Sequence, residues 1–145
     1  MRFSLAIHEA GHAVAAYHLG LTVYEIVMNR NPAYVLYEPG STESNLLFTM
    51  AGPWAELKYD PESIYYHDIG EKDQLDINES LWDRVWKENI HHAIIARSDC
   101  YFETSIERFI NIPEVWAQIT ALAEFLMSVD RLDGKEVTQI LEAQT

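Results

Sequence analysis

The sequence predicts a mainly α-helical domain with a small β-sheet of two or three strands near the N-terminus. Two observations predict this class: most of the chain carries apolar residues at helical spacing, and β-branched and aromatic residues gather in two short runs, 22–28 and 33–37. The chain has 145 residues, of which 48% are apolar, and this is enough to bury the core of one domain. We therefore expect a single domain over residues 1–145.

Local signals predict where each element begins and ends. Residues 4–19 are rich in Ala, Leu and His, and Gly20 is typical of the position after a helix end. The two strand runs are separated by a turn and closed by Pro39-Gly40, and Ser41 opens the next helix. Five further helices are expected, over 41–57, 70–85, 90–95, 115–127 and 133–141. The first of them should be kinked or broken at Pro53. Pro113 suits the first turn of the helix that contains 115–127.

The charge balance narrows the classes of function. Ten Lys and Arg stand against 23 Asp and Glu, a net charge of −13, which argues against a protein that binds nucleic acid or an anionic membrane. A lone cysteine, Cys100, cannot form an internal disulfide, so a reducing compartment is expected. The N-terminal apolar run is interrupted by His8-Glu9, and no run approaches the roughly 18 apolar residues of a membrane helix. We expect no signal peptide, no membrane segment and a cytoplasmic location.

The motif with a specific chemical meaning is His8-Glu9-Ala10-Gly11-His12, which reads HExxH on the first predicted helix. Residues four apart share a helix face, so the two imidazoles converge on one point, where neutral imidazole suits Zn²⁺. Glu9 stands beside this point and can take a proton from a water that the metal activates. The small apolar residues around the motif predict a buried helix, and buried His and Glu need partners, which a metal supplies.

A catalytic zinc site needs a third protein ligand, and four residues are candidates. His18 lies six residues after His12, about 120° away around an unbroken helix, which favours a packing or surface role. Glu56 is a candidate on a later helix, although a supporting carboxylate is the simpler interpretation. Asp73 lies on the apolar side of its predicted helix, whereas Asp76 points further from that side. Asp73 is therefore preferred, with Asp76 as the alternative.

The segment from His8 to Ala13, HEAGHA, resembles the zinc-site motif of the FtsH-type peptidases, the protease half of the membrane-anchored AAA proteases. The similarity extends to four further segments. Residues 32–39 resemble the family's edge strand and its closing proline, and residues 50–57 resemble a helix with an Ala-Glu run. Residues 70–73 resemble the segment that supplies the third ligand, an Asp. Residues 132–137 are close to a C-terminal Leu-Asp-Gly-x-Glu segment.

This resemblance implies a zincin-like metallopeptidase domain that hydrolyses peptide bonds. Zn²⁺ would be held by His8, His12 and an Asp, and Glu9 would act as the general base. A polypeptide substrate would add as an extended strand to the edge strand formed by Tyr34, Val35, Leu36 and Tyr37.

Two departures from the family pattern matter. The family usually has an apolar residue after the ligand Asp, and Asp73 is followed by Gln74, whereas Asp76 is followed by Ile77. The choice between the two therefore stays open. The chain also has no Walker phosphate loop or AAA module, so ATP dependence is not implied. The alternative is a catalytically inactive metal-binding or adaptor domain of the same fold, and a homo-oligomer or a separate ATPase partner is a further expectation.

Overall fold

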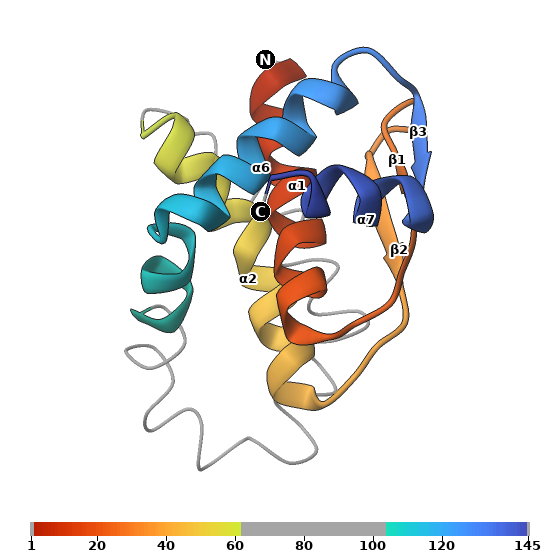
Figure 1. Ribbon diagram of the computed structural model, residues 1–145. Coiled ribbons are helices and arrows are strands. Elements are labelled where there is room, and N and C mark those ends of the chain that lie inside the picture. Colours follow the sequence, from red (N-terminus) through yellow and green to blue (C-terminus); the bar gives the residue numbers. More distant parts are fainter. Residues whose placement is uncertain (1, 62–103, 145) are drawn as a thin grey trace.

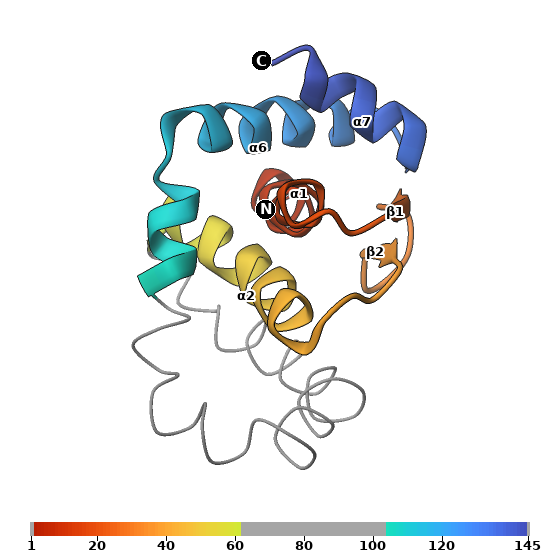
Figure 2. The ribbon, with the colours of Figure 1, turned by 60° about the horizontal axis from the view of Figure 1, so that its bottom comes forward.

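Helix α1, Arg2–Leu19, runs through the centre of the fold. The computed structural model describes residues 2–61 and 104–144. Figure 2 views α1 nearly end-on, with α2 (Thr42–Tyr59) on one side of it and α6 (Pro113–Leu126) on the opposite side. Residues 6–16 of α1 are all buried, as in a helix that is covered on every face. The HExxH motif therefore lies inside the fold, as its apolar surroundings predict.

A small antiparallel sheet covers another side of α1 (Figure 1). Its strands are β1 (Val23–Val27), β2 (Tyr34–Tyr37) and β3 (Arg131–Asp133), in the order β2-β1-β3. The predicted class, mainly helical with a small sheet, is confirmed. The first two strands match the predicted runs closely, whereas β3 comes from the far end of the chain and pairs with the other side of β1.

The ends of the helices confirm several local signals. Gly20 follows α1 with φ of +75°, a backbone conformation that glycine adopts without strain. The Ser41 hydroxyl caps α2 by accepting from the Ser44 backbone N–H at 3.1 Å. Pro113 occupies the first turn of α6, as predicted. Helix α2 continues past Pro53 to Tyr59 without a break.

The last helix, α7 (Gly134–Glu142), begins with a capping box. The Asp133 carboxylate accepts from the Glu136 backbone N–H at 2.8 Å, and Glu136 accepts in return from the Asp133 backbone N–H at 3.1 Å. Residues 104–110 are also helical. The helices expected over 70–85 and 90–95 lie outside the described residues, as does Cys100.

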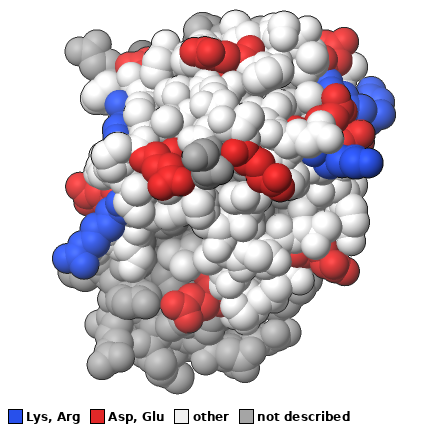
Figure 3. Space-filling view, in the orientation of Figure 1, with Lys and Arg blue, Asp and Glu red and all other residues white. Residues whose placement is uncertain are grey.

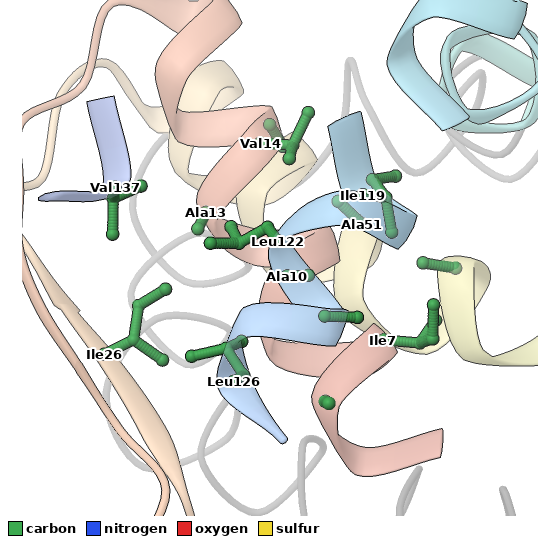
Figure 4. Close-up of a cluster of buried hydrophobic side chains, with 14 of the residues drawn as sticks. Ile7, Ala10, Ala13, Val14, Ile26, Ala51, Ile119, Leu122, Leu126 and Val137 are labelled. Atoms are coloured by element: carbon green, nitrogen blue, oxygen red, sulfur yellow. The ribbon is translucent and has the colours of Figure 1, made fainter. Parts of the chain in front are cut away.

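The core fills the space between α1, α6, α7 and the sheet, and it extends to Ala51 and Ala55 of α2 (Figure 4). Apolar side chains from each element meet there, and Leu122 and Leu126 of α6 are fully buried. The labelled members of this cluster are Ile7, Ala10, Ala13, Val14, Ile26, Ala51, Ile119, Leu122, Leu126 and Val137. One side of α1 is thus apolar and packs on α6, which leaves the side with the histidines to face α2.

The surface reflects the acidic composition. Figure 3 shows Asp and Glu side chains across the middle of the viewed face, with Lys and Arg at its two sides. Within residues 2–61 and 104–144, no helix combines the length and the apolar character needed to cross a membrane.

Candidate metal centre

Helices α1 and α2 approach very closely beside the motif. A Cβ on Gly11 would lie 2.8 Å from the Ala51 carbonyl oxygen and 2.8 Å from the Ala55 Cβ, closer than real Cβ atoms approach. Glycine at position 11 and two alanines on α2 therefore allow the backbones to touch. This contact brings the polar groups of α2 within hydrogen-bonding distance of the α1 histidines.

His8 is held by a carboxylate of α2. Its Nδ1 lies 2.9 Å from Oε1 of Glu56, and the two side chains are 4% and 2% exposed. Because a carboxylate accepts, Nδ1 carries a hydrogen in this contact, and in the neutral imidazole the lone pair is then on Nε2. A histidine that donates its far nitrogen to a carboxylate has the arrangement commonly found around protein-bound zinc.

His12 is held in the same way by a backbone group of α2. Its Nδ1 donates to the carbonyl oxygen of Phe48 at 2.8 Å. A carbonyl oxygen only accepts, so here too Nδ1 carries a hydrogen, and in the neutral ring the lone pair is on Nε2. Gly52 lies against the same imidazole: a Cβ there would be 2.5 Å from Cε1 and 2.7 Å from Cδ2 of His12, and nearer still to Nε2. The absence of a side chain at position 52 makes room for the ring.

The two imidazoles lie side by side on α1. Their ring centroids are 4.9 Å apart and the ring planes are inclined by 74°. Glu9, the neighbour of His8 in the motif, is 4% exposed. Imidazole nitrogens are ligands that suit Zn²⁺, so the two histidines fit part of a zinc site. The described residues fit two of the three protein ligands that a catalytic zinc site requires.

His18 and Glu56 occupy positions that fit roles other than metal ligation. The Nε2 of His18 donates to Oε1 of Gln118 on α6 at 2.7 Å, and the ring lines a small apolar cavity of about 190 Å³ together with Phe109. His18 thus contacts α6, whereas His12 contacts α2. Glu56 binds His8 at the nitrogen that a metal would not use, as expected of a supporting carboxylate.

The third ligand remains a prediction. Asp73 and Asp76 lie outside the described residues. Over the ranges 2–61 and 104–144, no three His, Cys, Asp or Glu side chains gather closely enough to hold one metal ion.

The predicted substrate strand, β2, lies at one edge of the described sheet. Tyr34 and Leu36 are exposed, whereas Val35 and Tyr37 are half-buried. Val35 and Tyr37 therefore lie on the face of β2 that points toward the interior. The Tyr37 ring stacks on Phe48 of α2. This places the strand next to the residues that hold His12.

Sequence reasoning overlooked two residues that contact His12. Phe48 acts through its backbone carbonyl, and no side-chain pattern can reveal such an acceptor. Gly52 did carry a signal, because a glycine within a predicted helix often marks a close contact. Its partner, His12, is separated from it by forty residues and is known only from the fold.

Comparison with known proteins adds no family assignment. The chain matches no protein-family model, and no curated protein matches it either. The functional interpretation therefore depends on the motif and on the geometry around it.

Proposed function

We propose that this protein is a zinc-dependent metalloendopeptidase of the FtsH type. The observation that supports this proposal is the paired support of His8 and His12, whose Nδ1 atoms are both engaged by acceptors on α2. In this proposal, the Nε2 atom of each ring binds the metal ion. Histidines whose Nδ1 atoms are engaged by such acceptors are typical of protein-bound zinc, so this arrangement favours a metal at this position.

Each residue of the site has a distinct role in this proposal. His8 and His12 hold the metal, and Asp73 completes the ligand set, with Asp76 as the alternative. Zinc held there would supply Lewis-acid chemistry, polarising the carbonyl of the peptide bond and lowering the pKa of the attacking water. Glu9 accepts a proton from that water and passes it to the leaving amine nitrogen. One water and one peptide bond thus yield a carboxylate and an amine.

The substrate in this proposal is an extended polypeptide. Because β2 is an outer strand of the described sheet, its outer edge offers the place for a further strand to pair. Main-chain pairing recognises any extended chain, so side-chain specificity would be weak. The acidic surface is consistent with this choice over a nucleic-acid substrate.

The test is metal content together with peptide hydrolysis. We expect elemental analysis to find a single zinc per wild-type chain and none in His12→Ala, with casein cleavage that a chelator stops and added Zn²⁺ restores. Absence of zinc from the wild type would overturn the proposal. Bound zinc without cleavage of casein or a peptide library would instead favour the inactive metal-binding domain.

A parallel assay identifies the third ligand. Dialysis against a mild chelator should remove zinc from Asp73→Asn far more readily than from Asp76→Asn, Glu56→Gln or His18→Ala. Asn keeps the size of the Asp side chain and removes its charge, so the comparison isolates the ligand role. Zinc retention by Asp73→Asn, with loss from Asp76→Asn, would move the assignment to Asp76.

Glu56 should tune the metal site without belonging to the ligand set. Replacing it by Ala removes the acceptor at 2.9 Å from His8 Nδ1, so the ring loses its orientation. We expect zinc affinity to fall by about 10–100-fold, the usual cost of losing such a partner. Competition with a chromophoric chelator measures this, and Glu107→Ala, an exposed acid outside the site, is the matched control. Complete loss of zinc in Glu56→Ala, with full retention in Asp73→Asn, would make Glu56 a ligand.

A further inference from the structure

Phe48 contacts His12 in two different ways. Its carbonyl oxygen accepts from His12 Nδ1 at 2.8 Å, and its ring stacks on the imidazole with the centroids 4.9 Å apart and the planes inclined by 30°. Phe48 is itself 6% exposed and belongs to the buried part of α2. A single residue therefore supplies both an edge contact and a face contact to the histidine.

Tyr37 extends this contact into the sheet. Its ring stacks on Phe48 with the centroids 3.8 Å apart and the planes inclined by 26°. Tyr37 belongs to β2, Phe48 to α2 and His12 to α1. The three rings form a continuous stack across three elements, which we call the ring stack.

The two contacts of Phe48 restrain different motions of the imidazole. A hydrogen bond at Nδ1 restrains one atom, but the ring can still turn about the axis through that atom. The side-chain torsion χ2 of histidine is broad, so it does not by itself set the plane. A stacked ring does set the plane, because tilting the imidazole would bring it into the neighbouring face.

We infer that Phe48 is a positioning residue for His12, and that Tyr37 supports Phe48 from the sheet. This inference rests on the proposed function, since it assigns the ring stack the task of aiming Nε2 of His12 at the metal. A ligand that is oriented before the ion arrives loses less freedom on binding, so the stack raises metal affinity. It also links the strand proposed to receive substrate to a residue proposed to hold the metal.

The test measures Co²⁺ binding, because Co²⁺ can replace Zn²⁺ and its visible absorption reports the geometry of its ligands. Phe48→Leu keeps the backbone carbonyl and removes only the ring. We expect its Co²⁺ affinity to fall by about 10–100-fold with an altered spectrum, the size of effect seen when a ligand loses its support. Phe48→Tyr restores the ring and should restore both affinity and spectrum.

Tyr37→Leu provides a second variant that leaves Phe48 in place, and it should weaken Co²⁺ binding by a smaller factor in the same direction. Tyr24→Leu is the matched control, because Tyr24 is a β1 tyrosine that is 49% exposed, and it should behave as the wild type. Circular dichroism identifies any variant that fails to fold. If Phe48→Leu does not fold, the spectrum of Tyr37→Leu decides.

The outcomes separate the two proposals. A wild-type chain that binds no Co²⁺ overturns the proposed function and removes the basis of this inference. A wild type that binds Co²⁺ while Phe48→Leu or, if that variant is unfolded, Tyr37→Leu shows the same affinity and spectrum overturns the inference alone. Loss in Phe48→Leu with rescue in Phe48→Tyr supports both.

Discussion

Replacing Glu9 by Gln should abolish peptide hydrolysis while leaving zinc bound. Glu9 is the carboxylate of the HExxH motif that the proposal does not use as a ligand, and it is 4% exposed within α1. Glutamine keeps the shape of the side chain but cannot accept the proton of the attacking water. Loss of a general base typically lowers kcat by about 10²–10⁴-fold. Hydrolysis of a fluorogenic peptide, followed beside zinc content, measures the two effects separately.

The control for this prediction is Glu124→Gln, which makes the same change of charge at an exposed position on α6. It should match the wild type in both zinc content and rate. Equal hydrolysis by Glu9→Gln and the wild type would reject Glu9 as the base. Loss of zinc from Glu9→Gln would show that Glu9 supports the metal rather than the proton transfer.

Replacing Gly52 by Ala should remove metal binding through one added methyl group. The new Cβ would overlap the His12 ring, 2.5 Å from Cε1 and 2.7 Å from Cδ2, so the imidazole must move. Movement of His12 would turn Nε2 away from the proposed metal position. We expect zinc affinity to fall by at least about 100-fold. Loss of a residue that supports a metal ligand typically lowers affinity by about 10–100-fold, so this effect should reach or exceed the upper end of that range. Chelator competition on the folded variant measures the loss.

Intrinsic helix propensity predicts that Gly52→Ala stabilises α2, so a loss of zinc from this variant would be diagnostic. Alanine is better than glycine in a helix by about 1 kcal/mol, so a general weakening of α2 cannot explain lost zinc. Thr49→Ala, a change on the same helix where the Thr49 hydroxyl donates to the Asn45 carbonyl, is the control and should keep zinc. Wild-type zinc affinity in Gly52→Ala would show that His12 Nε2 is not a metal donor.

The sequence predicts most of the described fold because its signals are local. Gly20, Ser41, Pro113 and the Asp133 capping residue act within one turn of the helix ends that they mark. Strand β3 was not predicted, because a segment of three residues is too short to show the alternation of a strand. It becomes a strand through its pairing with β1, a contact that no local pattern encodes.

In the candidate site, too, the locally encoded features could be predicted and the long-range contacts could not. Helical spacing alone places His8 and His12 on one face of α1, so their convergence follows from the motif itself. The partners of the two histidines could not be predicted, because Glu56 and Phe48 reach them only when α2 packs against Gly11. The helix-face position favours Asp73 and the residue that follows favours Asp76, so the choice between them depends on the chelator experiment.

Strand β3 has a consequence for the order of events during synthesis. The ribosome makes α1 before α6, which covers the apolar side of α1, and before β3, which completes the described sheet. Contacts between such distant segments form slowly, because a long loop must close first. The side of α1 that packs on α6 therefore stays uncovered until α6 has been made, whereas α2, which follows soon after α1, can already pack on the side with the histidines.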